Sequence, residues 1–245
     1  MAMSVRASVW VALAVGVAGT WVAYSLGSWQ TKRAEGKLAV EARWRAAESA
    51  APRDVSPANT SSVRGELPQR VRLRGQFAHE KSVWLDNRPL DGRAGMILLA
   101  PLVLDDSASG RATVVLVMRG WAPRDMQERA RLPKVAQPRD PIVVEGLALP
   151  HPPRVYELSD VAEPATLPAL WQNLDYAEYA KASGLHVEPW VVQQQGGADD
   201  GLVRAWTRPA SGVEKHRGYA LQWYSLAGLI AVLTLVLGAR ALRRK

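Results

Sequence analysis

The chain has 245 residues, of which 48% are hydrophobic, enough for one substantial domain with accessory segments. It contains no cysteine, which excludes disulfides, CxxC redox chemistry, thiolate nucleophiles, iron–sulfur clusters and zinc sites with cysteine ligands. The formal net charge of +8 suits either nucleic acid or anionic lipid headgroups. We favour lipid and expect no nucleic-acid partner, because the sequence holds no basic–aromatic recognition motif, RNP pattern or zinc finger.

Two long apolar segments lie near the ends of the chain. Residues 7–26 contain no ionisable side chain except Tyr24, and residues 219–239 contain no charge. Each approaches the ~20 apolar residues that cross a ~30 Å hydrocarbon core as a helix. Tryptophan and tyrosine, which favour the headgroup region, stand near the segment ends. We predict transmembrane helices over residues 7–27 and 218–239.

A cleaved signal peptide is the alternative explanation for the first segment. The segment is longer than the usual ~7–15-residue apolar core of a signal peptide, and no small-x-small cleavage site follows Leu26. We therefore favour a retained membrane anchor.

The basic residues that flank the two segments predict the orientation. By the positive-inside rule, residues 1–6 and the basic tail, residues 240–245, are cytoplasmic, and residues 28–217 form an extracytoplasmic domain. Further cations within residues 32–45 and 215–217 are discounted, because long translocated loops largely escape the rule. No Ser/Arg-rich transit segment precedes the first span, so we expect a bacterial inner membrane with the domain in the periplasm.

Local patterns predict the helices and loops between the spans. Residues 30–48 are rich in Ala, Glu, Lys and Arg, which predicts that the first helix continues into solvent. Residues 51–62 contain Pro, Asp, Asn and Ser and predict a loop. Asp175 is a candidate N-cap for a short helix over residues 176–182, which Gly184 would end.

Most of the remaining pattern is typical of strands. In residues 69–77, Val71 and Leu73 alternate with arginines, which predicts a half-buried strand with a basic face. Further strands are predicted at 82–86, 96–104, 113–118, 142–149 and 187–195. Short strands with few helices between them predict a mainly antiparallel sheet, barrel-like in its curl, with short helical additions. The expected fold class is a membrane-anchored α+β protein.

Five segments together resemble a known family. They are GSWQTKR (27–33), VWLDNRPLDGRAGMILLAPL (83–102), VVLVMRGWAP (114–123), LPALWQNLD (167–175) and RP followed by KHRGYALQWYSLAG (208–228). In this order, around two terminal spans, they resemble the SURF1 family of cytochrome c oxidase assembly factors. The resemblance implies a non-enzymatic chaperone of respiratory-chain biogenesis that aids delivery of haem a to subunit I of an aa3-type oxidase. The implied partners are subunit I, the haem a synthesis machinery and the lipid bilayer.

His216 is the candidate cofactor ligand, because it precedes the second span at the water–membrane boundary. Imidazole is a good ligand for haem iron. If the helix already runs here, Tyr219, Ala220 and Trp223 share its face, which provides one ligand, one small gap and two aromatic walls. The alternative is an interfacial histidine that only forms hydrogen bonds. Because bacterial relatives handle haem a through the matching histidine, the resemblance favours a transient haem a site at His216, Tyr219 and Trp223.

Four arginines lie within the resembling motifs: Arg88, Arg93, Arg119 and Arg208. Their guanidinium groups suit haem propionates or carboxylates of an oxidase subunit. The alternative, which we favour for any single one, is that they satisfy backbone carbonyls and aspartates inside the domain.

Three residues at the exit of the first span, Gly27, Trp29 and Gln30, are predicted to contact the second helix. Gly27 would allow close approach of the two backbones, and Gln30 would supply a polar contact. Helix packing is the favoured explanation for all three.

No catalytic constellation is apparent: the sequence lacks a GxSxG elbow, a P-loop, a dinucleotide fingerprint and a Ser-x-x-Lys set in a plausible setting. His79, His151 and His186 lack metal-ligand spacing, so no metal site is expected. The acidic pairs 105–106 and 199–200 are expected to be solvated in turns. Two other functions remain: a haem-independent scaffold for an oxidase assembly intermediate, and a membrane-anchored periplasmic hydrolase, which the missing constellation disfavours.

Overall fold

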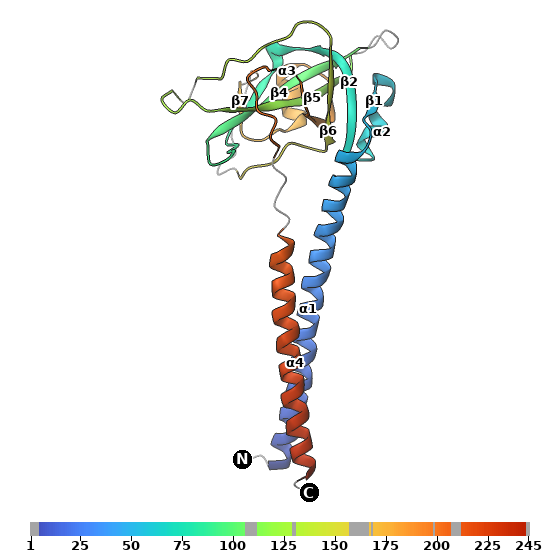
Figure 1. Cartoon of the computed structure of the whole chain (residues 1–245), viewed down its shortest axis with the longest axis vertical. Coiled ribbons are helices and arrows are strands. Elements are labelled where there is room, and N and C mark those ends of the chain that lie inside the picture. Colours follow the sequence, from blue (N-terminus) through green and yellow to red (C-terminus); the bar gives the residue numbers. More distant parts are fainter. Residues whose placement is uncertain are drawn as a thin grey trace. The chain divides into compact units, whose positions relative to one another are not determined.

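The computed structural model describes residues 5–105, 112–128, 131–156, 167, 169–197, 199–206 and 212–243. The chain divides into two compact units, a helical unit (Met1–Arg43 with Pro209–Lys245) and a domain (Trp44–Arg208). The elements, labelled in Figure 1 where there is room, are α1 (Val5–Ser49), β1 (Arg53–Val55), η1 (Pro57–Asn59), α2 (Thr60–Arg64), β2 (Gln69–Phe77), η2 (His79–Lys81), β3 (Val83–Leu85), β4 (Gly95–Leu104), β5 (Val114–Pro123), β6 (Ile142–Leu149), β7 (Leu170–Trp171), α3 (Tyr176–Ser183), β8 (Val187–Gln194) and α4 (Val213–Arg243).

The helical unit is an antiparallel pair formed by α1 and α4. A Cβ atom at Gly238 would contact Leu13, one at Gly19 would contact Ile230, and one at Gly27 would press on Tyr224. Residue numbers therefore rise along α1 as those of their neighbours fall along α4, which is the order of antiparallel helices. The start of α1 and the end of α4 accordingly lie at the same end of this pair (Figure 1).

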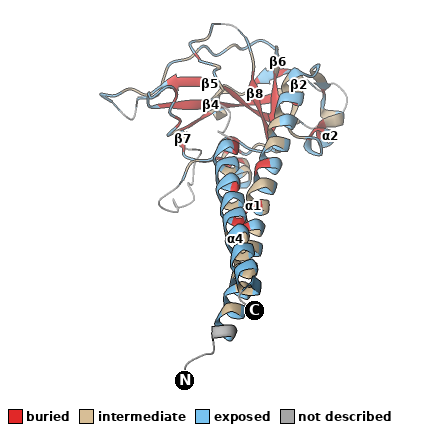
Figure 2. Ribbon diagram, turned by 60° about the horizontal axis from the view of Figure 1, so that its bottom comes forward, coloured by how far each residue is buried: buried red, intermediate tan, exposed pale blue. Residues whose placement is uncertain are grey.

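The two long helices expose an apolar surface. Each is long and apolar enough to cross a membrane, and only 6% of the most apolar stretch of each helix is buried. Trp21 is 69% exposed and Leu235 is 72% exposed, whereas the strands of the domain are largely buried (Figure 2). Exposed apolar surface of this extent is typical of a helix that lipid or a partner covers. The prediction that the first helix continues beyond its apolar segment is confirmed, because α1 runs to Ser49.

Within the described ranges, eight strands form one mixed sheet in the order β1-β2-β6-β8-β5-β4-β3-β7, and an additional pairing of β2 with β4 closes five of them into a ring. The ring pairings β2–β4, β2–β6, β4–β5 and β6–β8 are antiparallel. Parallel pairing joins β5 to β8, β1 to β2 and β3 to β7, so the sheet is mixed but mainly antiparallel, as predicted. All six predicted strands are present, and β2 and β6 have the predicted bounds.

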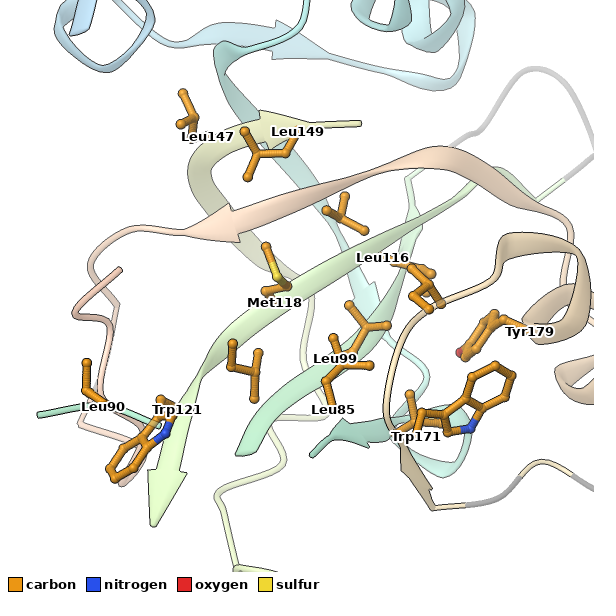
Figure 3. Packing of buried hydrophobic residues seen from close by; sticks show 14 of the residues in the cluster. Leu85, Leu90, Leu99, Leu116, Met118, Trp121, Leu147, Leu149, Trp171 and Tyr179 are labelled. Carbon is orange, nitrogen blue, oxygen red and sulfur yellow. The ribbon is translucent and has the colours of Figure 1, made fainter. Parts of the chain in front are cut away.

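Strand composition follows from how many faces of each strand are buried. β2 contributes Val71, Leu73 and Phe77 to one apolar cluster that receives side chains from all five ring strands and therefore fills the ring. β4 and β5 are buried on both faces and accordingly read as continuous apolar runs. Their second face belongs to another cluster, shown in Figure 3, with Leu99, Leu116 and Met118 among its members.

Helix α3 closes the second cluster from outside the ring. Asp175 caps it by accepting hydrogen bonds from two backbone N–H groups, and Gly184 ends it in the left-handed conformation, as predicted. Tyr179 is fully buried, and its ring lies 6.2 Å from that of Trp171 (Figure 3). Its hydroxyl donates to the carbonyl of Lys81 at 2.6 Å, and burial raises its pKa above the usual range.

The prediction of a loop over residues 51–62 is wrong in part. This stretch contains β1, η1 and the start of α2. Val55 and Val63 are buried in the ring cluster, so tertiary packing orders a segment whose composition predicts a turn. The last turns of α1 also join the domain, where Ala47 is buried in the second cluster.

Candidate functional site

The helical unit brings His216 and Gln30 together. His216 lies in the first turn of α4, and its Nδ1 is 2.7 Å from Oε1 of Gln30 on α1. An amide oxygen can only accept, so Nδ1 is the donor, and in a neutral imidazole with this tautomer the lone pair is on Nε2. This is the arrangement in which a second residue orients a histidine whose other nitrogen binds a metal.

Two further contacts pack the helices beside this pair. A Cβ atom at Gly27 would lie 2.7 Å from the ring of Tyr224, so the absence of a side chain here permits the close approach. Thr31 Oγ1 lies 3.3 Å from the hydroxyl of Tyr224, a contact that the sequence analysis missed. Because Thr31 stands one helical turn after Gly27, the i, i+4 rule would have placed both on one face. Trp29, predicted with Gly27, is 52% exposed, and Arg33 lies over its ring.

The helix does run through His216, but the predicted gap beside it is closed. Ala220 is only 6% exposed, so no open slot remains at this position of α4. Tyr219 is 45% exposed and Trp223 is half-buried, so both rings stay available to a ligand.

In the domain, Arg88 ties two distant segments together. It is 6% exposed and donates from Nη1 to the carbonyl of Asp86 at 2.6 Å and from Nη2 to that of Gln172 at 2.7 Å. It lies in a turn where Asn87 and Asp91 have positive φ, which the fixed contacts of the turn stabilise. Arg88 therefore satisfies carbonyls inside the domain, which is the alternative that the sequence analysis favours.

Trp121 joins a third segment to this turn. Its Nε1 donates to the carbonyl of Arg88 at 2.6 Å. Gly95 makes room for the indole, because a Cβ atom at Gly95 would overlap the ring. The guanidinium of Arg93, an exposed residue, lies 5.8 Å from the centre of the same ring.

Arg119 occupies an irregularity in β5. Leu98 pairs with Gly120 and Leu99 with Met118, so Arg119 is the extra residue of a β-bulge. A bulge redirects the side chain that it carries, here away from the ladder pattern of β5. Arg208, the fourth predicted arginine, lies outside the described residues.

The bulge buries the Arg119 guanidinium beside Asp200. The two side chains are 3% and 8% exposed, and Nη2 lies 2.8 Å from Oδ2. The same oxygen accepts from Arg204 at 2.6 Å, and the Arg119 guanidinium also covers the Phe77 ring at 5.0 Å. Burial lowers the pKa of Arg119, and Asp200 offsets part of this effect.

The prediction that Asp199 and Asp200 are both solvated is wrong for Asp200, because only Asp199 is exposed. Nothing in the local sequence distinguishes these two neighbouring aspartates. The side chain of Asp200 is buried against Arg119, which is distant in the chain, and against Arg204, four residues later. Sequence reasoning missed both Asp200 and Arg204.

The basic face predicted for β2 is paired with carboxylates. Arg72 Nη2 lies 2.7 Å from Glu145 on β6, and Arg70 lies 3.6 Å from the same carboxylate. Arg74 lies 3.2 Å from Asp105. The hydrogen bond and charge of Glu145 raise the pKa of Arg72. This strand therefore offers no free cationic surface for a polyanion.

Among the described residues, no group of three or more His, Asp and Glu side chains is placed to hold a metal ion.

Comparison with known proteins agrees with the motifs. The sequence matches the SURF1 family over residues 17–228. The chain belongs to the SURF1 family. The cytochrome oxidase assembly protein SHY1 of Saccharomyces cerevisiae is similar, with 24% identity over 166 residues that cover 66% of this chain and 41% of that protein. The matched region thus spans about two fifths of the yeast relative. The predicted membership of the SURF1 family is confirmed.

The five SURF1-like segments fall into two groups, each joined within one unit. Segments 27–33 and 208–228 meet through Gln30 and His216 in the helical unit. Segments 83–102, 114–123 and 167–175 meet through the carbonyl and the guanidinium of Arg88 in the domain. Residues of the SURF1-like segments therefore make specific tertiary contacts in each unit.

Proposed function

We propose that this SURF1 protein is a membrane-anchored, non-enzymatic assembly factor for a cytochrome oxidase. Family membership supports this assignment, and so does similarity to SHY1, whose name describes oxidase assembly. The two long apolar helices supply the membrane anchor. The client in this proposal is subunit I of an aa3-type oxidase, and the haem a synthesis machinery is a second partner.

The finer proposal is that His216 binds haem a in transit to subunit I. The observation that carries it is the Gln30–His216 hydrogen bond, which orients the ring so that the neutral imidazole would present the lone pair of Nε2. Imidazole is a good ligand for haem iron, so His216 would be the residue that holds the iron. Because Ala220 is buried, the macrocycle has no room at that position, and the exposed Tyr219 and half-buried Trp223 are the rings left to support it. Ligation by one residue suits a protein that must release its cargo.

Two measurements test this proposal: the haem content of the purified protein, and complementation of a strain that lacks the gene. We expect His216→Ala to lose the haem a absorbance of the purified protein. Gln30→Ala should lower haem affinity by about 10–100-fold, as is usual when the residue that orients a ligand is removed. His186→Ala, which changes an exposed histidine of the domain, is the matched control and should complement fully.

The outcomes separate the alternatives. Undiminished haem in purified His216→Ala would eliminate ligation by this residue. Full oxidase activity with that variant would favour a haem-independent scaffold. Normal oxidase in the deletion strain would contradict the assembly role and reopen the disfavoured hydrolase.

We further propose that the domain lies in the periplasm of a bacterium and that both termini are cytoplasmic. The absence of native cysteine makes single-cysteine labelling clean. We expect Arg139→Cys in the domain to react with a membrane-impermeant maleimide once the outer membrane is permeabilised. Arg240→Cys, near the end of α4, should react only after lysis. The reverse labelling pattern would invert the orientation.

A further inference from the structure

A pocket of about 490 Å³ lies in the domain, and its lining includes Trp84 of β3, Leu98 of β4 and Arg119 of β5. Segment 131–141, here called the strap, follows β5 and supplies part of its lining. The strap is held by Arg119, whose Nη1 donates to the carbonyl of Ala136 at 3.1 Å, and by His79, whose Nε2 lies 2.7 Å from that of Pro138. Both of these side chains also line the pocket.

One part of the lining is polar and positively charged. Arg119 and Lys134 contribute two cations, while His79, Ser82 and Gln137 contribute further polar groups. No Asp or Glu is present among the described residues that line the pocket. The pocket is therefore electrostatically suited to an anion.

Two of the lining residues each carry a polar atom that is buried without a hydrogen-bond partner in the described part of the chain. These atoms are Ser82 Oγ and Arg119 Nε. Both groups can donate a hydrogen bond, and a buried polar group without a partner destabilises a protein because its lost contact with water is not replaced. The carboxylate that does serve Arg119 is shared, because Asp200 Oδ2 also accepts from Arg204. An additional hydrogen-bond acceptor in the pocket would supply the partner that these donors lack.

The rest of the lining is apolar. Trp84 and Leu98 form the sheet side, and Leu132 and Val135 of the strap pack against the same cluster. A ligand that fills the pocket must therefore place an apolar body against these side chains and an anionic group toward Arg119 and Lys134. A bare inorganic anion would leave the apolar surface uncovered.

We propose that this pocket binds a small amphipathic carboxylate, with its carboxylate toward Arg119, Ser82 and Lys134 and its apolar body against Trp84 and the strap. This site lies within the domain and does not depend on the role proposed for His216. An oxidase assembly function and this binding activity can therefore each fail without the other.

Hexanoate is a suitable probe, because its neutral analogue hexanamide has the same length. We expect ligand-observed NMR on the full-length protein in lipid nanodiscs to show hexanoate binding at least about tenfold tighter than hexanamide, since only the carboxylate gains charge-assisted hydrogen bonds. Empty nanodiscs account for partition into lipid. Equal binding of the two probes, or binding of neither, would overturn the proposal.

Variants locate the site. Lys134→Gln should weaken hexanoate binding by about fivefold, which is near the most that a single exposed ion pair contributes. Arg139→Gln removes the same charge from an exposed residue of the strap outside the pocket lining and is the matched control. Ser82→Ala should also weaken binding by about fivefold. If Lys134→Gln and Ser82→Ala both bind hexanoate as the control does, the carboxylate is not held here and the proposal is wrong.

Discussion

Replacing Asp200 by alanine is expected to lower the free energy of unfolding of the domain by about 3–5 kcal/mol, because it removes the carboxylate from a buried ion pair. Arg119 is 3% exposed, and Asp200 Oδ2 accepts from both Arg119 and Arg204. The variant leaves the Arg119 guanidinium buried without this counter-charge. Burial already lowers the pKa of Arg119 while Asp200 is present. Removing the Asp200 carboxylate therefore adds to the existing cost of burying the Arg119 charge.

Denaturant unfolding of the full-length protein in nanodiscs, followed by tryptophan fluorescence, measures this loss. Asp199→Ala is the matched control, because it removes the adjacent but exposed carboxylate and should change the free energy of unfolding by less than about 0.5 kcal/mol. Equal effects of the two substitutions would show that the buried pair does not stabilise the domain. Replacing Arg119 and Asp200 together by apolar residues should recover part of the loss, because no buried charge then lacks its partner.

Gly75→Ala is expected to destabilise the domain by about 3 kcal/mol or more, because Gly75 stands where the ring closes. This residue of β2 pairs with Ile142 of β6 on one side and with Leu104 of β4 on the other. A Cβ atom here would overlap the carbonyl oxygen of Val103 and would lie 3.0 Å from Cα of Leu104. These are backbone atoms of a paired strand, so they can move only if the β2–β4 pairing opens.

Gly65→Ala is the control for this second prediction. Gly65 follows α2 with φ −74°, and the nearest atom to an added Cβ is 3.9 Å away. Alanine fits there without strain and should stabilise the domain by about 0.4–1 kcal/mol, because it restricts the unfolded chain. Limited proteolysis in nanodiscs compares the two variants. A Gly75→Ala domain as resistant as the wild type would show that the ring tolerates a side chain at its closure.

Contacts within one helical turn or along one strand could be predicted from the sequence. The alternation of Val71 and Leu73 with arginines predicts β2, and it forms at residues 69–77 because side chains of a strand point alternately to its two faces. Asp175 and Gly184 predict the ends of α3, since capping involves only neighbouring backbone groups. Apolar length alone predicts the two long helices.

Candidate site residues could be named from the sequence, but their partners could not. His216 stands out at the end of an apolar segment, yet its orientation depends on Gln30, 186 residues earlier in the chain. Arg119 is conspicuous in its motif, but the bulge that redirects it requires the register between β4 and β5. The burial of Asp200 rather than Asp199 likewise depends on Arg119, 81 residues away.

The sequence by itself therefore determined the two long helices, α3, six of the eight described strands and the family, because each depends on periodicity or on residue order along the chain. The tertiary structure alone decided the parallel pairing of β5 with β8, the closure of β2 onto β4, and which carboxylates neutralise which arginines. The physical reason is that strand register and ion pairing depend on contacts between residues far apart in the chain, and no local propensity specifies them.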